Sequence, residues 1–517
     1  MVEKTFELDG KIIGYEEAID WEDDFLQKKT KHDKNLAFLR DLYPKAASLE
    51  QLVAFYLKLD SRRIECNVSD SLQGGFNTVL AVQVHDTPEN KYTKQRDVRE
   101  HDWPQEGHNV ILRFPTPASC GEDVHPGSIL EKMRCEVAIA WLRIRQTIAG
   151  VCGRPVPSDY LPVTLPSSVK LPPNTGYLLL EFFGPSMGTL LNVAADSRIR
   201  PPSEIDPAKK QNLYRSFSRI MLSLARVPQP RIGAFRFNDD GTITLDNRPL
   251  VSTITIHESE GAPRTIPPNQ TFSRVDDYID SMISFHEHRF LAAPHAVVSR
   301  FDGQLQMAAW VFIRSLLPHF VNKRRNTGPF VLQLSDKNPC NFIVDDDWNV
   351  TAMYDLEFII AAPVESMDAP SWLGWTSLDE NASTGYSAYD AERSEFMDQF
   401  QEEELRMIGT ATPLGARLSD VMNESWRSER LWLFATVLGL NGVTQLAEHR
   451  FEPLFGSNGF PRASSLYRIW RMDAEDVLAK KEADNDRYLA QVAALFGRGN
   501  AAGNSKAADV VLAEEAR

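Results

Sequence analysis

The strongest constraint on the fold is the uneven distribution of strand and helix patterns along the chain. Short β-type runs gather between about residue 63 and residue 183, interrupted by one long helical pattern over residues 127–150. From about residue 184 to residue 497 the pattern is mainly helical, broken by one β-hairpin signal over residues 341–355. Because strands and helices occupy different parts of the chain, a central parallel sheet is disfavoured and an α+β fold is predicted.

These patterns predict a helical N-terminal leader, a small strand-rich part, a large helical part and a disordered tail. Their bounds are residues 1–54, 55–183, 184–497 and 498–517. The tail is predicted to be disordered because small and polar residues dominate it. Residues 85–108 are polar and predict a solvated loop that is longer than most connections.

The composition disfavours several classes of function. The formal net charge of −15 argues against a nucleic-acid partner, because such proteins concentrate Lys and Arg. No secretion signal is visible, and no stretch of about 18 residues is apolar and free of charge, so no membrane span is expected. Five cysteines at irregular spacings, without a CxxC pair, suggest neither disulfides nor a zinc site and suit the cytoplasm.

An Asp and an Asn lie five positions apart between two strongly apolar stretches, as Asp336 and Asn341. The hairpin pattern that follows would bring Asn341 close to Asp355. Carboxylate and amide oxygens can hold Mg²⁺ against ATP phosphates, and a further carboxylate can take a hydroxyl proton. The pattern resembles the catalytic loop and metal-binding strand of protein-kinase-like phosphotransferases, in which Asp336 would be the base and Asn341 and Asp355 the metal ligands. The Asp residues at 345–347 are predicted to serve the hairpin turn.

The strand-rich part holds further candidates. Gly74 and Gly75 would let backbone N–H groups approach a phosphate, although a Gly-Gly pair is more often an ordinary hairpin turn. Arg113 interrupts an apolar strand, where a cation on an edge strand is usually exposed. Glu136 falls on a largely apolar helix face, where an unpaired carboxylate is costly. An ion pair between Arg113 and Glu136 would explain both positions.

In this order, Gly-Gly-Phe-Asn, a strand Arg, a helix Glu, D-x-x-x-x-N and Y-D-L-E resemble the aminoglycoside phosphotransferase and choline-kinase-like family, in its divergent fungal form. The resemblance covers roughly residues 55–375. It implies a two-lobed protein-kinase-like fold, with a small N-terminal sheet lobe and a large, mainly helical C-terminal lobe. It also implies ATP and Mg²⁺ as cofactors and a small-molecule hydroxyl as the phosphoryl acceptor.

The resemblance also implies a role for each matching residue. Residues 74–77 would form the nucleotide loop, Arg113 would contact the ATP phosphates with Glu136 as its partner, and residues 181–183 would form the hinge that meets adenine. The implied nucleotide-binding residues are Gly74, Gly75, Phe76, Asn77, Arg113, Glu136, Glu181, Phe182 and Phe183. Asp336 would be the base, and Asn341 and Asp355 the magnesium ligands.

Two positions depart from the family pattern. Leu334 stands where the family has the His that supports the catalytic loop, which leaves open a binding module that keeps the fold without catalysis. Lys337 follows the Asp where an apolar residue is typical. It would bind a phosphate or face solvent, and solvent is favoured because most Lys side chains are exposed.

A second alternative is a serine hydrolase. Residues 184–188, GPSMG, match the G-x-S-x-G nucleophile elbow and follow an apolar strand pattern. Such an elbow requires repeated strand and helix units on both sides. The strands here lie before Ser186 and the helices after it, so the hydrolase is disfavoured.

Overall fold

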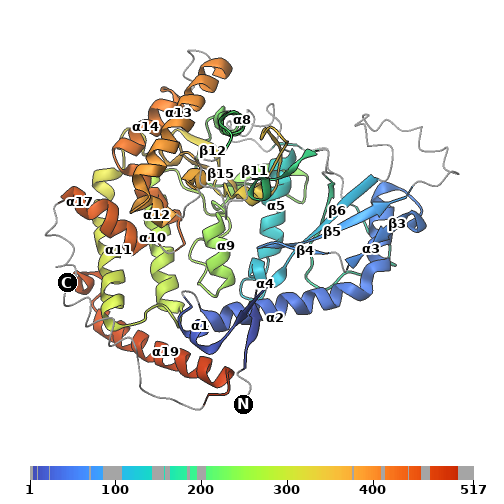
Figure 1. The fold of residues 1–517 in the computed structure, drawn as a ribbon, viewed down its shortest axis with the longest axis horizontal. Coiled ribbons are helices and arrows are strands. Elements are labelled where there is room, and N and C mark those ends of the chain that lie inside the picture. The colour runs from blue at the N-terminus through green and yellow to red at the C-terminus, as the bar shows by residue number, and fades with distance from the viewer. Residues whose placement is uncertain are drawn as a thin grey trace.

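The computed structural model describes residues 4–8, 10–21, 24–68, 71–85, 108–141, 156–157, 163–182, 187–194, 205–374, 378–408, 414–440, 442–455 and 466–498. Helices make up 55% and strands 15% of the structure, so the predicted α+β class is confirmed. Figure 1 shows the sheet that contains β5 and β6 on one side of the molecule, helices such as α10, α11 and α14 on the other, and α5 and α9 between them.

The largest sheet is built from the strands predicted within residues 55–183. Its order is β3 (Ile64–Cys66), β5 (Asn77–Val84), β6 (His108–Pro115) and β8 (Leu178–Glu181), and the short β4 (Leu72–Gln73) also pairs with β5. All neighbours are antiparallel, and Arg113 on β6 lies opposite Val79 on β5 and Leu178 on β8. β6 is therefore an interior strand.

The predicted helical leader of residues 1–54 contains α1 (Tyr15–Ile19), α2 (Phe25–Leu42) and most of α3 (Ala46–Leu57), which ends three residues beyond the predicted boundary. A short hairpin of β1 (Phe6–Leu8) and β2 (Lys11–Ile13) precedes them. Apolar residues of α2 and α3, including Leu42 and Leu52, share one core with the β5 and β6 side chains. The start of α2 instead packs, through Phe25, with Tyr488 of α19 (Ala474–Leu495).

The expectation of a single hairpin within residues 184–497 is wrong. Two further antiparallel pairs occur, formed by β10 (Ala234–Phe237) with β11 (Thr242–Asn247) and by β12 (Phe330–Leu334) with β15 (Ile359–Pro363). Both β12 and β15 are buried along their whole length, so they lack the alternation of polar and apolar residues that identifies a half-exposed strand. β11 also pairs with β7 (Val156–Pro157).

Most of the remaining helices form one large core with these strands, to which α4 and α17 contribute no buried side chain. Their bounds are α4 (Pro117–Cys120), α5 (Ser128–Trp141), α7 (Leu191–Ala194), α8 (Pro207–Ala225), α9 (Ser252–Ser259), α10 (Val275–Ala292), α11 (Arg300–Phe320), α12 (Leu378–Ala382), α13 (Tyr386–Ile408), α14 (Leu418–Arg427), α15 (Arg430–Leu438), α16 (Val443–Leu446), α17 (Glu452–Phe455) and α18 (Tyr467–Trp470).

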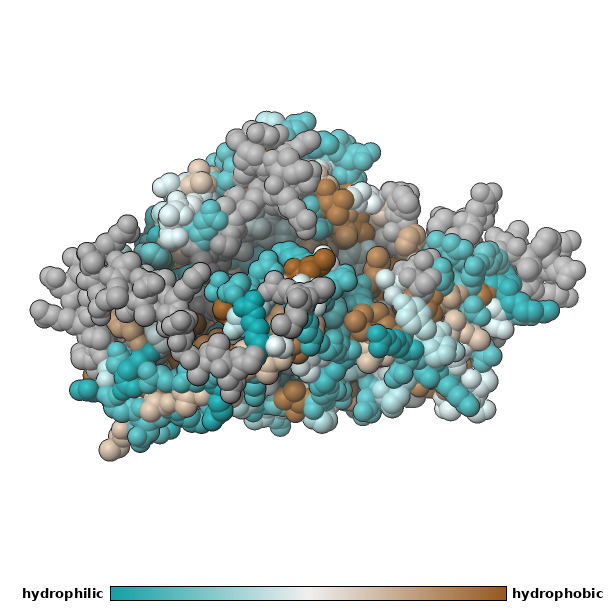
Figure 2. Space-filling model, turned by 60° about the horizontal axis from the view of Figure 1, so that its bottom comes forward, coloured by the Kyte–Doolittle hydropathy of each residue, from teal (hydrophilic) through white to brown (hydrophobic). Residues whose placement is uncertain are grey.

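Figure 2 shows one face of the molecule. Among the residues that are coloured there, most are hydrophilic, and the apolar side chains form small separate groups. No helix among the described residues has the length and apolar character needed to cross a membrane. The predicted tail lies outside the described residues from residue 499 onward, as do residues 86–107 of the predicted polar loop.

Candidate active site

The predicted catalytic loop joins β12 to β13 (Phe342–Val344). Ser335 fastens its start, because the backbone N–H donates to Phe358 O at 3.0 Å and the hydroxyl donates to the same oxygen at 2.7 Å. Asp336 Oδ1 accepts the backbone N–H of Asn338 at 3.1 Å, and Asn338 Oδ1 accepts that of Cys340 at 3.0 Å. Polar side chains therefore shape this loop between two buried strands.

The hairpin of β13 and β14 (Val350–Met353) brings Asn341 and Asp355 to the same end of the sheet, as predicted. Phe342 lies opposite Met353, and the Tyr354 backbone N–H donates to Asn341 O at 2.8 Å. At the far end, Asp345 Oδ1 accepts the backbone N–H of Asn349 at 2.8 Å, which confirms the predicted turn chemistry.

Asp355 has an uncommon backbone conformation. Its φ of 55° and ψ of 54° lie in the left-handed region, which costs a residue other than Gly about 1–3 kcal/mol. Such strain persists only where the surrounding structure holds it in place, and it concentrates at functional sites.

Arg113 is the centre of the polar contacts around Asp355. Its side chain is buried, forms an ion pair with Glu136 and lies 3.1 Å from Asp355 Oδ1 and 3.6 Å from Glu357 Oε2. The predicted pairing of Arg113 with Glu136 is confirmed. The alternative of an exposed edge-strand Arg is wrong, because β6 has a neighbour on each side.

Two charged residues of this cluster were missed by the sequence analysis. Lys132 Nζ forms an ion pair with Glu357 and donates to Asn77 Oδ1 at 3.2 Å. Asn77 Nδ2 in turn donates to Asp355 Oδ1 at 3.4 Å. Two features of the sequence could have identified them. Lys132 precedes Glu136 by one helical turn, and Glu357 ends the Y-D-L-E motif. We name these six residues, Asn77, Arg113, Lys132, Glu136, Asp355 and Glu357, the buried charge cluster.

Burial alters the titration of the carboxyl groups in the buried charge cluster. Burial and the charge of Glu357 raise the pKa values of both Asp355 and Glu136. Burial also favours the neutral form of Glu357, but Lys132 and Arg113 together hold the pKa of Glu357 below its usual value. Glu357 is therefore the carboxylate that stays ionised, and both Lys132 and Arg113 lie next to it.

Asp336 has the environment of a base. Burial raises the pKa of its carboxyl group, while the Asn338 N–H and the Asn341 amide oppose the rise. The Asn341 Nδ2 atom is itself buried and forms no hydrogen bond that meets the usual geometric limits. A carboxylate with a raised pKa accepts a proton more readily than an ordinary Asp.

The predicted nucleotide loop is the tight turn between β4 and β5. The Gly74 N–H donates to Asn77 O at 2.8 Å, and a Cβ on Gly75 would meet nothing within 4 Å. The Phe76 ring packs against that of Phe358, with centroids 5.4 Å apart. The turn therefore borders the segment that follows Asp355 and offers an open backbone beside the buried charge cluster.

The predicted hinge is described only in part. Glu181 ends β8, is exposed and lies opposite Val110, three positions along β6 from Arg113. Phe182 is half-buried, and Phe183 lies outside the described residues. The structure therefore does not bring the described hinge residues into contact with the buried charge cluster.

Lys337 does not face solvent, so that expectation is wrong. Its side chain is half-buried, and Nζ donates to Asp368 O at 3.0 Å. Burial lowers the pKa of this Lys. The backbone carbonyl of Lys337 also accepts the Trp372 indole N–H at 2.5 Å, so both the side chain and the backbone of Lys337 anchor the predicted catalytic loop.

The elbow-like sequence meets the hairpin of β13 and β14. Ser186 lies outside the described residues, but Gly188 has a φ of 115° and a Cβ on it would lie 1.9 Å from Val344 O. Thr189 and Leu190 then pair with β13 as β9. All strand pairs in the described residues are antiparallel, unlike the parallel sheet that surrounds a nucleophile elbow.

In the described part of the chain, no group of three or more His, Cys, Asp or Glu side chains is arranged to hold a metal ion. Mg²⁺ does not require one, since it commonly takes one or two carboxylates together with phosphate oxygens and water. A cavity of about 450 Å³ lies elsewhere, between α10, α11 and α18. Its Glu287 accepts hydrogen bonds from Arg314 and Trp470, so these three polar groups of its wall pair with one another.

Comparison with known proteins identified no homologue. No family model matches the chain, and neither a curated protein nor a solved structure matches it.

Proposed function

We propose that the chain is an ATP- and Mg²⁺-dependent phosphotransferase that phosphorylates a hydroxyl group of a small molecule in the cytoplasm. The proposal includes a two-lobed protein-kinase-like arrangement, in which the sheet around β5 and β6 and the mainly helical remainder face each other across the site. The observation that supports it is the convergence of three segments on Asp355 and its neighbour Tyr354. The glycine turn contacts Asp355 through Asn77 and β6 contacts it through Arg113, while the Asn341 carbonyl of the predicted catalytic loop accepts the Tyr354 N–H.

The donor atoms fit a magnesium nucleotide. Asp355 and Asn341 offer the carboxylate and amide oxygens that Mg²⁺ prefers, and Asp355 is the partly exposed carboxylate of the buried charge cluster. That cluster contains three carboxylates and two cations, and the pKa values of Asp355 and Glu136 are raised, so a bound cation would favour the ionised forms of these two groups. Asp355 and Asn341 would therefore hold the metal.

The residues of the chain have complementary tasks in this proposal. When bound, Mg-ATP would supply the γ-phosphoryl group for transfer to the acceptor oxygen, with ADP as the leaving group. Asp336 orients the acceptor hydroxyl and takes its proton. Arg113 contacts the phosphates while Glu136 and Glu357 fix its guanidinium.

A binding module without catalysis is the second candidate. Leu334 supports it, because this residue is buried opposite Ile359 and cannot form the hydrogen bonds of the His that the family has there. The contacts of Arg113 and Asn77 with Asp355 Oδ1 also support it, since a metal would have to compete for that oxygen. The phosphotransferase is favoured because Asp336, Asn341 and Asp355 are all retained.

Thermal unfolding with and without Mg-ATP tests the proposal. A ligand that binds only the native state raises the melting temperature by mass action. Asp355→Ala should remove the magnesium dependence of this shift. Asp346→Ala is the matched control, because Asp346 carries the same charge on the exposed turn of the same hairpin. An equal magnesium dependence in the two variants contradicts the assigned metal site.

A further inference from the structure

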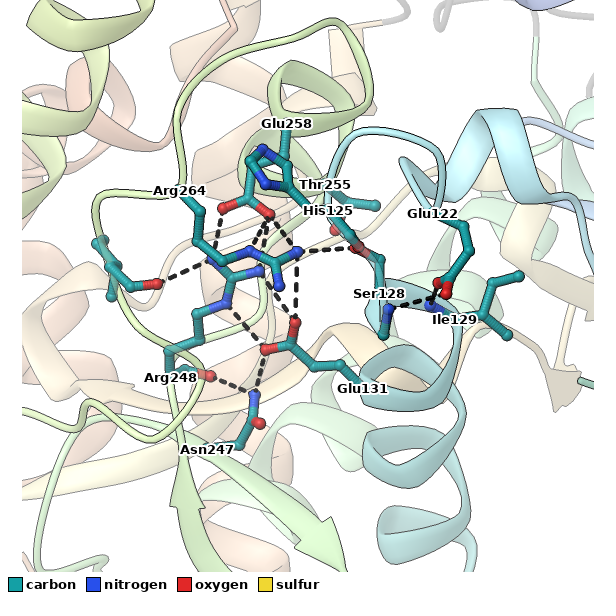
Figure 3. A network of polar contacts seen from close by, with 12 residues as sticks. Glu122, His125, Ser128, Ile129, Glu131, Asn247, Arg248, Thr255, Glu258 and Arg264 are labelled. Carbon is teal, nitrogen blue, oxygen red and sulfur yellow. Dashed lines mark hydrogen bonds and ion pairs between the residues drawn. The ribbon is translucent and has the colours of Figure 1, made fainter. Parts of the chain in front are cut away.

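Helix α5 links the buried charge cluster to a second buried network. Lys132 and Glu136 contact Glu357 and Arg113 from this helix, while its Glu131 contacts Arg248, which follows β11. Figure 3 shows Glu131 at the start of α5 reaching into a set of residues from the β11 end, α9 and the segment after it. One helix therefore takes part in both networks.

Arg248 is held by two carboxylates at once. Its side chain is 1% exposed, with Nε 2.9 Å from Glu131 Oε1 and Nη2 3.0 Å from Glu131 Oε2. On its other edge, Nη1 lies 2.5 Å from Glu258 Oε1 and Nη2 lies 2.8 Å from Glu258 Oε2. Two such bidentate contacts fix the orientation of the guanidinium as well as its position.

Arg264 extends the network to the first residue of α5. Its Nη2 donates to Ser128 Oγ at 2.7 Å and to Glu258 Oε2 at 2.9 Å. Asn247 Nδ2 donates to Glu131 Oε1 at 3.1 Å. The charges of Arg248 and Arg264 balance those of Glu131 and Glu258, and these side chains bond to one another. The network therefore has no unpaired charge for a ligand, and its role is structural.

We propose that Arg248 and Glu131 are positioning residues, which lock the first turns of α5 and so hold Lys132 and Glu136 in the buried charge cluster. Glu131 and Lys132 are adjacent in sequence, so a shift of this turn moves both. A displacement of about 1 Å is enough to disrupt a site of this kind. The lock is a property of the fold, whereas its effect on nucleotide binding rests on the proposed function.

Two substitutions test the lock. Glu131→Gln keeps the shape of the side chain and removes its charge, and Arg248→Met removes both bidentate contacts. Glu403→Gln is the matched control, because Glu403 is a buried carboxylate on α13 that contacts Arg215 and Arg219, away from α5. If Arg248→Met does not fold, Glu131→Gln alone decides the outcome.

The first measurement is the alkylation rate of two buried thiols, followed by mass spectrometry of the peptides. Cys135 lies on α5, and Cys66 on β3 serves as an internal reference. Both network variants should increase the Cys135 rate by about 10- to 100-fold and leave the Cys66 rate unchanged, because α5 then opens locally. Glu403→Gln should change neither rate. Equal changes at Cys66 and Cys135, or no change at either, overturn the lock.

The second measurement is the dissociation constant of Mg-ATP. Glu131→Gln should weaken binding by about tenfold and Glu403→Gln should leave it unchanged. Faster labelling of Cys135 with unaltered affinity would refute the positioning role. A wild type that binds no Mg-ATP contradicts the proposed function, and the thiol rates still decide whether Glu131 and Arg248 lock the helix.

Discussion

Arg113 Nη1 lies 3.1 Å from Asp355 Oδ1, so the centre of β6 is joined directly to the residue that follows the hairpin of β13 and β14. The same guanidinium forms an ion pair with Glu136 on α5. Three elements from distant parts of the chain thus depend on one cation. Removing that cation affects the fold and the proposed nucleotide site together.

The pairing predicts a particular pattern of stability. Arg113→Ala should lower the free energy of unfolding by about 3–5 kcal/mol, because it leaves buried carboxylates without a partner. Adding Glu136→Ala should restore part of this loss, since one of those carboxylates is then removed, but should restore no Mg-ATP affinity. Urea unfolding of the two single variants and the double variant measures the effect. Strictly additive losses would contradict an interaction between the two side chains.

Asp336 is predicted to act on the transfer step and not on nucleotide binding. Asp336→Asn should keep the affinity for Mg-ATP and reduce turnover by roughly 10²- to 10⁴-fold on an acceptor found by screening. Burial raises the pKa of Asp336, so the wild-type rate should rise with pH through a pKa above the ordinary 3.8. A pH–rate profile of the wild type and binding titrations of both proteins provide the measurements.

Leu334→His separates the phosphotransferase from the binding module. If the chain is a phosphotransferase, activity should be equal or higher in this variant, because a His at this position supports the catalytic loop in the family that the sequence resembles. A wild type that binds Mg-ATP yet phosphorylates nothing in a broad acceptor panel, together with an inert Leu334→His, would favour the module.

His286 predicts how stability depends on pH. Burial and the neighbouring His257 lower the pKa of His286 to about 3, whereas an unfolded His titrates near 6.5. Between these values the unfolded chain binds one more proton than the folded chain, so this group destabilises the fold by about 1.4 kcal/mol for each unit that the pH falls. His286→Gln should flatten the stability profile between pH 6.5 and pH 3. His288→Gln, at an exposed position on the same helix, is the control for the substitution itself.

Local patterns predicted much of the site. The turn chemistry at Asp345 and the apolar strands around it are sequence-local, so the approach of Asn341 to Asp355 followed from the hairpin. Arg113 and Glu136 were paired because each is costly in an apolar pattern without a partner.

The rest depends on tertiary packing. Lys132 lies on an amphipathic helix, where a Lys is usually exposed, and it is buried here only because the turn holding Glu357 packs against α5. Arg248 contacts Glu131 on α5 and Glu258 on α9, and no pattern in the sequence indicates that these segments lie together. The strands β12 and β15 are buried on both faces, so they gave no alternating pattern.

Gly188 supports the hairpin that carries Asp355, which yields the last prediction. Its φ of 115° already favours Gly, and a Cβ there would lie 1.9 Å from Val344 O on β13. Gly415 has a φ of 76° with nothing within 4 Å of its Cβ position, so Gly415→Ala measures the backbone cost alone, about 1–2 kcal/mol. Gly188→Ala should cost about 1–3 kcal/mol more, because β9 and β13 must separate. Urea unfolding should rank the two variants in this order, and equal losses would show that β9 does not press on β13.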